Sequence, residues 1–415
     1  MLSFRRLIFY SFCLGILVGL TSTAYYLALT GGTHLVWELI PQWLHFKHPE
    51  DFSSYAWIFT TIGGFIVGVT AHYLGAFGGL DLAIKEIHET GNIDFKPGMT
   101  ITSLFSLIFG SSVGPEAPLV DIHGSMGSWL AARLNLTKEM ARILTFCGIG
   151  AALGAFFGAP MGCALLTLEL PHKKGLEYYE AIIPVMVSSI MGFIVFRVMT
   201  GTTIGGKYVF PEYSKLDILD FWYAVILGVV GAGIAILTIL IMRGTKKLFQ
   251  PSFCPPILLT TLGGLSLGLM AKFLPLTLFF GEAQIQTVID TGTQLGAGIL
   301  LLTALGKMLT LSLSIWTGFR GGFIFVLLFI GTTIGKAISL LIPSIHPTVA
   351  IVSMMASVLV AALKTPMSGA IIISAISGVE LIPIVTISTL VSYLLTSRFS
   401  LLQNQRSRTE SPYHN

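Results

Sequence analysis

The stretch Gly110–Gly124, GSSVGPEAPLVDIHG, places one carboxylate, Glu116, between two prolines and behind a glycine. Gly114 permits a sharp or left-handed backbone, and a proline is tolerated in the first turn of a helix because its missing N–H would have no partner there. We therefore predict that a helix begins here.

A helix start has unpaired N–H groups and about half a positive charge, so it attracts anions. In a membrane, such a helix end is tolerated only where it is buried in protein or lines a cavity. We therefore predict an ion site, with Glu116 as a tethered anion in or beside the place where a free anion would bind. The alternative is a carboxylate that only stabilises the helix start through its dipole.

The composition indicates a membrane protein. The chain has 415 residues, of which 53% are hydrophobic and 11% charged, whereas soluble domains carry about 25% charged residues. We expect an all-α polytopic membrane protein surrounded by a lipid bilayer. The formal net charge of +4 is too small and too scattered to indicate a nucleic-acid partner.

Basic residues flank the apolar runs and predict the topology. Placing these flanks in the cytoplasm satisfies the positive-inside rule and puts both termini inside, in the inner (plasma) membrane. The first apolar run is expected to be a retained helix rather than a signal peptide. The flanks are Arg5, Arg6, Lys173, Lys174, Arg243, Lys246, Lys247, Arg398, Arg406 and Arg408.

The four cysteines show no close pairing and lie in or beside apolar runs, as expected of small core residues. They are Cys13, Cys147, Cys163 and Cys254. We expect no bound metal and no cofactor.

Apolar segments form two series, and several are well short of the ~20 residues that a full span needs. Short, glycine-interrupted segments predict a buried site built from half-helices. The first series comprises residues 7–30, 55–76, 99–113, 117–133, 140–154, 159–170 and 181–200. The second comprises residues 219–242, 256–274, 295–315, 321–342, 347–363, 367–379 and 381–397.

A matched spacing indicates an internal repeat. Glu116 is followed 44 positions later by Pro160, and Gly322 is followed 44 positions later by Pro366. An inverted repeat would bring both helix starts to the middle of the membrane. We expect a first repeat at 1–200, a linker at 201–218, a second repeat at 219–400 and a short cytoplasmic tail at 401–415.

Small residues also recur at helical spacing, which predicts close helix packing. One set is Gly148, Ala152 and Ala155, and another is Gly228, Gly231 and Ala232.

Four ordered stretches resemble the signature segments of the CLC chloride channel and transporter family, most closely a divergent bacterial branch of ion-transport proteins. They are GPEAPLVDIHG (114–124), GAPMGCALLTLEL (158–170), GFRGGFIFVLLFIG (318–331) and KTPMSGAIIISA (364–375). The resemblance implies a CLC-type inverted repeat with many tilted and broken helices. It also implies chloride as the substrate and a homodimer that meets near 159–200 and 367–397.

The resemblance also implies a set of site residues. Glu116 falls on the family's external gating glutamate, flanked at the anion by Gly114, Pro115 and Ala117. The second half supplies an anion-binding segment at Gly321, Gly322, Phe323, Ile324 and Phe325. An earlier segment falls on Gly78 and Gly79, and the family's late tyrosine falls on Phe399.

The chain departs from the family pattern at several of these positions. Glycine stands where the family has a serine hydroxyl, and Phe399 stands where it has a tyrosine, so Tyr393 is the candidate replacement. Pro115 lacks an N–H. The site is therefore expected to rely on backbone amides, which bind an anion without the tight hold of a fixed lysine. Arg320 either raises the local potential or lies at the interface.

Proton coupling has no standard carrier in this sequence. The family's inner glutamate falls on Leu170, and Glu169 points about 100° away from that position. This favours a channel or a weakly coupled conductor over a proton-coupled antiporter. Asp121 and His123, together with Glu169, are candidates for another proton path, the alternative being polar residues that face a vestibule or a partner.

Other classes of function explain less of the sequence. An unrelated inverted-repeat transporter accounts for the glycine pattern but not for the ordered GPEAP and GFRGG segments. An intramembrane enzyme would need a motif such as HExxH or paired catalytic carboxylates on facing spans, neither of which the sequence offers, so we expect no enzyme. A membrane subunit that does not conduct is the remaining alternative. Lys307, Glu282 and Lys336 receive no role from the sequence.

Overall fold

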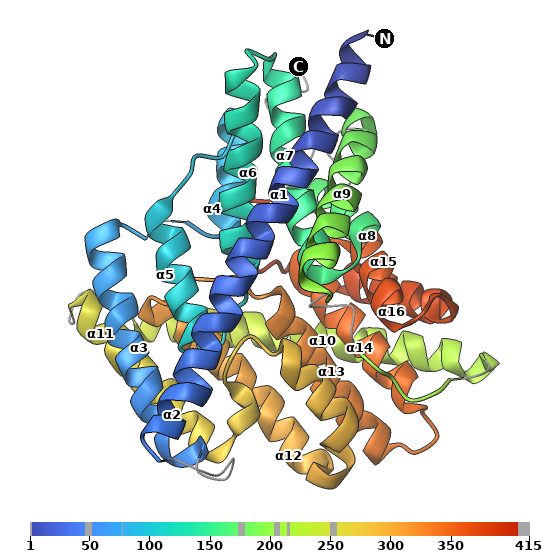
Figure 1. Cartoon of the computed structure of the whole chain (residues 1–415). Helices are drawn as coiled ribbons and strands as arrows, with labels where there is room; N and C mark the ends of the chain where they lie inside the picture. Colours follow the sequence, from blue (N-terminus) through green and yellow to red (C-terminus); the bar gives the residue numbers. More distant parts are fainter. Residues whose placement is uncertain are drawn as a thin grey trace.

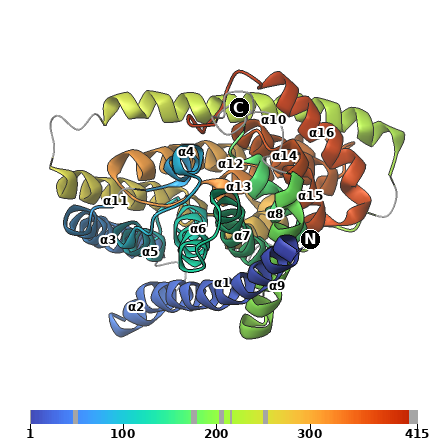
Figure 2. The ribbon, with the colours of Figure 1, turned by 90° about the horizontal axis from the view of Figure 1, so that it is seen from above.

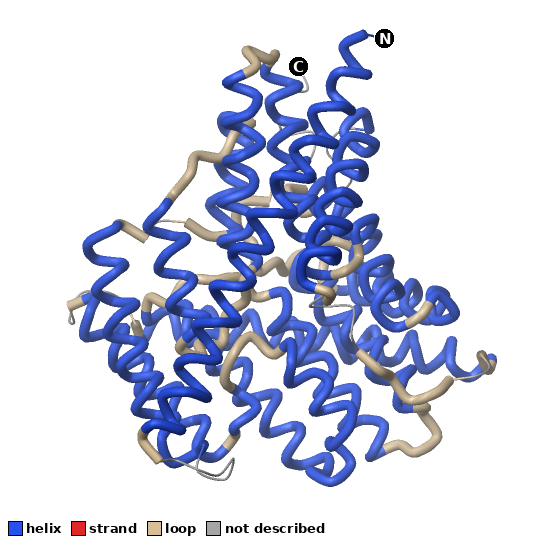
Figure 3. Tube along the Cα trace, viewed as in Figure 1, coloured by secondary structure: helices blue, strands red, loops and turns tan. Residues whose placement is uncertain are grey.

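The structure, a computed structural model, describes residues 2–45, 52–76, 78–172, 179–202, 208–213, 216–249 and 255–405. Four residues of the predicted basic flanks, Lys173, Lys174, Arg406 and Arg408, lie outside these ranges, as does Cys254. The described chain consists of helices and connecting loops (Figure 3).

The first half contains α1 (Leu2–His34), α2 (Ile40–Trp43), α3 (Phe52–Leu74), α4 (Leu80–Thr90), α5 (Pro97–Ile108), α6 (Glu116–Arg133), α7 (Lys138–Phe157), α8 (Pro160–Glu169) and α9 (Ile182–Thr200). The second half contains α10 (Ile218–Leu248), α11 (Pro256–Phe273), α12 (Glu282–Thr317), α13 (Ile324–Leu341), α14 (Pro347–Leu363), α15 (Pro366–Ser377) and α16 (Ile382–Leu395). Within α12, Gly296 has φ 78° and marks a kink between two helical parts.

The helices form a layered bundle (Figures 1 and 2). Seen from above, α1 and α9 cover one face and α10 covers the opposite face, with α6, α7, α13 and α14 between them. The central helices are the most apolar and the most enclosed, since every residue of α14 from Thr348 to Leu363 is buried. The residues of these central helices therefore lie in a core that is shielded on both sides.

Eight described helices are long and apolar enough to cross a membrane, whereas four other apolar helices are shorter. The predicted series of segments agrees with this pattern. Two regions were not predicted. The helix α4 has charged residues on one face, and the first part of α12 carries Glu282 and Asp290, so neither gave a continuous apolar run.

The predicted small-residue faces are confirmed as sites of close helix packing. A Cβ atom at Gly148 would collide with the carbonyl oxygen of His123 on α6. A Cβ atom at Gly231 would likewise collide with the Ser357 side chain on α14. The glycines therefore let the helix backbones approach each other, as small residues do inside membranes.

Candidate anion site and gate

The starts of α6 and α13 face each other and are joined by their backbones. Gly114 N–H donates to Gly322 O at 2.8 Å, and Gly322 N–H donates to Gly114 O at 2.6 Å. This antiparallel pair joins the two halves of the chain at one point. The predicted helix start after Gly114 is confirmed, because α6 begins at Glu116 with Pro115 as its N-cap residue.

The Glu116 carboxylate lies between these two helix starts and is fully buried. Its Oε1 accepts a hydrogen bond of 2.8 Å from the Phe325 N–H, in the first turn of α13. The backbone N–H groups of Ile324 and of Glu116 itself also face the carboxylate. Its Oε2 receives no hydrogen bond from the described residues. The carboxylate therefore occupies a pocket of helix-start amides, which is where an anion would bind.

The reason for glycine at Gly114 differs from our prediction. Its φ is not among the positive values found in the described chain, so no left-handed turn requires a glycine there. The requirement is space. A Cβ atom at Gly114 or at Gly322 would collide with Glu116 Oε2. The two glycines thus form the walls of the carboxylate pocket.

Aromatic rings pack around the Phe325 side chain. The Phe325 ring stacks on Phe157 with centroids 4.5 Å apart, and Phe280 contacts the same ring edge-on at 5.5 Å. Both Phe157 and Phe325 are fully buried. This packing fixes the N-terminal turn of α13, and with it the amide that holds Glu116.

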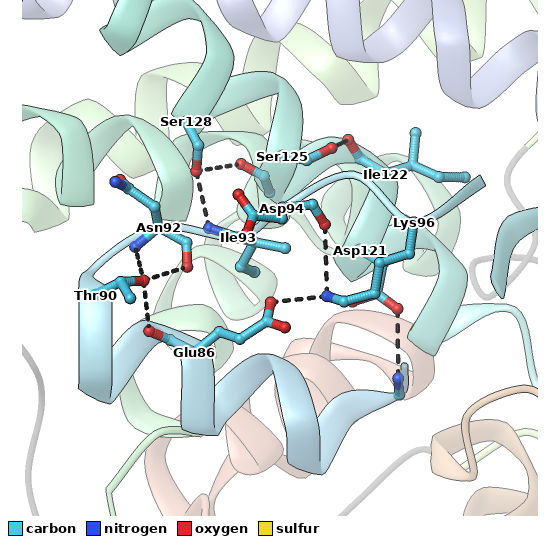
Figure 4. Close-up of polar contacts among 12 residues, drawn as sticks. Glu86, Thr90, Asn92, Ile93, Asp94, Lys96, Asp121, Ile122, Ser125 and Ser128 are labelled. Atoms are coloured by element: carbon cyan, nitrogen blue, oxygen red, sulfur yellow. Dashed lines mark hydrogen bonds and ion pairs between the residues drawn. The ribbon is translucent and has the colours of Figure 1, made fainter. Parts of the chain in front are cut away.

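The start of α4 faces a second carboxylate. Gly79 has φ 122° and precedes the helix, and its N–H donates to Asp121 Oδ2 at 3.3 Å. Lys96 Nζ lies 3.8 Å from Asp121 Oδ1 and 2.7 Å from Glu86 Oε2. Figure 4 shows these side chains converging from α4, from α6 and from the segment before α5. The predicted anion-binding segment at Gly78 and Gly79 is thus in contact with Asp121.

His123 faces away from this cluster. Its Nδ1 lies 2.9 Å from Leu119 O, and its Nε2 lies 3.2 Å from Ser22 Oγ on α1. Two positions along a helix correspond to a rotation of about 200°, so Asp121 and His123 project to nearly opposite sides. The structure therefore does not bring these two candidates for a proton path together.

Comparison with known proteins decides the family. A family model described as voltage gated chloride channel matches residues 63–397. The chain belongs to this family. The family consists of anion channels and transporters, which places the chain among membrane transport proteins and not among enzymes.

A curated relative of this CLC protein agrees with the family match. A chloride/fluoride channel protein of Pseudomonas syringae pv. tomato is 27% identical over 372 residues, which covers 83% of this chain and 77% of the relative.

Two solved structures share the fold. The crystal structure of a CLC-type fluoride/proton antiporter superimposes with a TM-score of 0.81 at 18% identity, covering 97% of this chain and 98% of that one. The crystal structure of a slow cyanobacterial Cl⁻/H⁺ antiporter superimposes with a TM-score of 0.82 at 20% identity, covering 95% of this chain and 94% of that one. The predicted CLC-type all-α membrane fold is therefore confirmed.

The other acidic candidate of this CLC protein, Glu169, caps a helix. Its Oε2 accepts from the Ser368 N–H at 2.9 Å and from Ser368 Oγ at 2.6 Å, while its Oε1 accepts from the Met367 N–H at 3.1 Å. The carboxylate thus satisfies the start of α15. The adjacent Leu170 is also buried, at 5% exposure, and contributes no ionisable group.

The two candidate aromatic ligands, Tyr393 and Phe399, lie near the end of the described chain, on α16 and just after it. Tyr393 is half-buried on α16, within electrostatic range of Glu169. Phe399 is half-buried after the same helix, where its N–H donates to Thr396 O. Phe399 has no hydroxyl with which to bind an anion.

A cavity of about 260 Å³ reaches the anion-binding segment predicted at Gly321–Phe325. Phe323, the N-cap residue of α13, lines it together with Asp81 in the first turn of α4. The basic residues Arg243 and Lys246 also line this cavity, which we call the basic cavity. Positive charge at its wall attracts anions towards the helix starts.

Arg320 contributes to a neighbouring cavity of about 460 Å³, which it lines together with Lys246. Its guanidinium therefore adds to the positive potential on this side of α13.

Lys307 is a structural residue that the sequence did not reveal. It is fully buried on α12, and its Nζ donates to the carbonyl oxygens of Thr277, Leu278 and Phe279 at 3.1, 3.0 and 2.6 Å. These bonds hold the segment that carries Phe280 against Phe325. Lys307 lies 28 to 30 positions after the carbonyl groups that it contacts, so no local sequence pattern could have identified these partners.

Proposed function

We propose that this chain carries chloride or a similar small anion across a cell membrane, along a path lined by helix starts and gated by Glu116. The observation that carries the proposal is the buried Glu116 carboxylate, which accepts a hydrogen bond from Phe325 N–H between two facing helix starts. A mobile carboxylate in an anion pocket excludes other anions until it is protonated or displaced.

Backbone amides suit conduction better than a fixed cation would. Each helix end contributes on the order of 0.3 to 2 kcal/mol of attraction, which offsets part of the cost of removing an anion from water. Such partial charges hold an anion without trapping it. The ligands we propose are the amides of Ala117, Gly321 and Phe323–Phe325, with the basic cavity as the route to them. The N–H groups of Gly114 and Gly322 donate to each other's carbonyl oxygens and serve as the frame of the site.

We propose channel-like or weakly coupled transport in place of tight proton exchange. Leu170 stands where the resemblance gives the inner proton carrier, and Glu169 is engaged at the start of α15. A proton-coupled antiporter is the alternative. The reversal potential of the reconstituted protein under a pH gradient at fixed chloride separates them, because only coupled transport shifts that potential with pH.

We also propose a homodimer with one path in each subunit. Exposed apolar side chains lie along the predicted contact segments, among them Ile183, Ile194 and Val198 on α9 and Ile371 on α15. The division into repeats at 1–200 and 219–400, and the inner-membrane location with both termini in the cytoplasm, remain proposals. Chemical cross-linking in native membranes tests the dimer.

The gate is tested by the isosteric change Glu116→Gln in proteoliposomes loaded with chloride. We expect the path to stay open and the dependence of anion efflux on external pH to be largely lost, because the amide does not titrate. An unchanged pH dependence would refute the gating role. The same vesicles loaded with fluoride compare the two halides.

A further inference from the structure

Asp121 lies on α6 five positions after Glu116. It lies towards the end of the molecule where α1 begins, because α6 runs antiparallel to α1. Ser22 contacts His123, and the earlier Thr21 contacts the later Met126. An anion that moves between Glu116 and the end of the molecule where α1 begins therefore passes Asp121 on its way.

The Asp121 side chain is 1% exposed and is aimed at the start of α4. One carboxylate oxygen accepts from the Gly79 N–H, and the other receives no hydrogen bond from the described residues. A Cβ atom at Gly78 would approach Asp121 Oδ2 to 2.8 Å, so the glycine leaves room for the carboxylate. Asp121 thus repeats the arrangement of Glu116, with a buried carboxylate, a helix start and a glycine wall.

The start of α4 also belongs to the anion route. Asp81 in its first turn and Phe323 at the start of α13 line the same basic cavity. A helix start carries about half a positive charge, so this one is a natural binding place for an anion that arrives through the cavity. In the structure, the place is taken by Asp121.

We propose that Asp121 is a second tethered anion, which occupies the start of α4 and competes there with the transported anion until it is protonated or displaced. This inference rests on the proposed anion transport and deepens it. The path then has two carboxylate gates in series, one at each of two helix starts.

Charged neighbours control the second gate. Among the described residues, Lys96 from the segment before α5 and Glu86 from α4 are the charged groups that face Asp121, while α5 contributes the uncharged Met99. Lys96 lies closer to Glu86 than to Asp121, by 2.7 Å against 3.8 Å. Its charge is therefore shared, and Asp121 is only partly compensated.

Both neighbours connect the buried carboxylate to water. The side chains of Lys96 and Glu86 are 17% and 22% exposed. The cluster in Figure 4 therefore includes two partly exposed charged groups beside the buried carboxylate.

The test measures equilibrium binding of chloride, and separately of fluoride, to the purified full chain by calorimetry. All variants carry Glu116→Gln, so that the first gate does not titrate. We expect this parent to bind the anion more tightly at pH 5 than at pH 7.5. Adding Asp121→Asn should give tight binding at both pH values. At pH 7.5 the double variant should bind on the order of tenfold more tightly than the parent, if Asp121 leaves the start of α4 open for about a tenth of the time in the parent.

Asp94→Asn is the matched control, since Asp94 is exposed two positions before Lys96 and contacts it only through its backbone oxygen. It should leave binding and its pH dependence unchanged. Unchanged binding in the Asp121→Asn variant would overturn the inference. A lack of anion flux through the wild-type protein in vesicles would instead count against the proposed function, because the binding experiment does not depend on transport.

Two further variants decide the matter even if Asp121→Asn does not fold. Lys96→Gln removes the neighbouring cation and should move the binding transition to higher pH, because the charged carboxylate loses its partner. Glu86→Gln frees Lys96 for Asp121 and should move the transition to lower pH. Shifts in opposite directions support the second gate, whereas no shift or parallel shifts refute it.

Discussion

Replacing Gly322 by alanine places a methyl group where the Glu116 carboxylate lies. The new carbon would be 2.1 Å from Glu116 Oε2, whereas non-bonded atoms are most stable at about 3.5 Å, so this oxygen must retreat by about 1.4 Å. The two oxygens belong to one rigid carboxylate, and the 2.8 Å bond from Phe325 N–H is therefore lost.

A hydrogen bond to a charged group contributes about 1.5 to 3 kcal/mol, so the fraction of time that the carboxylate spends in its pocket should fall by roughly 10- to 150-fold. We expect faster chloride efflux from proteoliposomes at pH 7.5, up to the limit set by the open path. Acidification should then accelerate efflux much less than in the wild-type protein.

A double-mutant cycle separates displacement of the carboxylate from simple obstruction. With Glu116→Ala in place, Gly322→Ala should have no further effect on efflux. Gly233→Ala on α10 is the control, because a methyl group at that position would meet no other atom. Wild-type efflux and pH dependence in the Gly322→Ala protein would refute the reasoning, and so would reduced efflux in both backgrounds.

Three other changes test the supporting contacts. Lys307→Met should lower the melting temperature, because three carbonyls lose a buried donor at about 1 to 3 kcal/mol each, and the exposed Lys272→Met should not. Glu169→Ala should also lower the melting temperature, because the loss of the helix cap removes about 0.5 to 2 kcal/mol of stability. The pH profile of efflux should stay as in the wild type, and a changed profile would instead assign Glu169 to a proton path. Asp81→Ala should expose the segment around Asn404 to limited proteolysis, because Asp81 accepts from the backbone N–H groups of Gln403 and Asn404 at 2.7 and 2.8 Å; equal cleavage rates would contradict this.

The sequence predicted the helix starts better than the contacts between them. Pro115, Pro160 and Pro366 mark starts that the structure confirms, because proline and glycine act locally on the backbone. The helix α4 was not predicted, since only one of its faces is apolar. Its amphipathic pattern was the signal available.

The residues around Asp121 show why the rest could not be predicted. Lys96 is 25 positions before Asp121, and Gly79 is 42 positions before it. Their meeting depends on how α4, α5 and α6 pack, which no local pattern encodes. Gly114 gives a second example. The sequence predicted that it is needed for its backbone freedom, whereas the structure shows that it leaves space for the Glu116 carboxylate.

The pairing of Gly114 with Gly322 has a consequence for how such a protein can change over evolutionary time. Both hydrogen bonds join main-chain atoms, so they do not depend on the chemistry of any side chain. What the pair demands is small volume at two positions and an unbroken register between the halves. The side chains of neighbouring residues such as Pro115 and Phe323 take no part in these two hydrogen bonds.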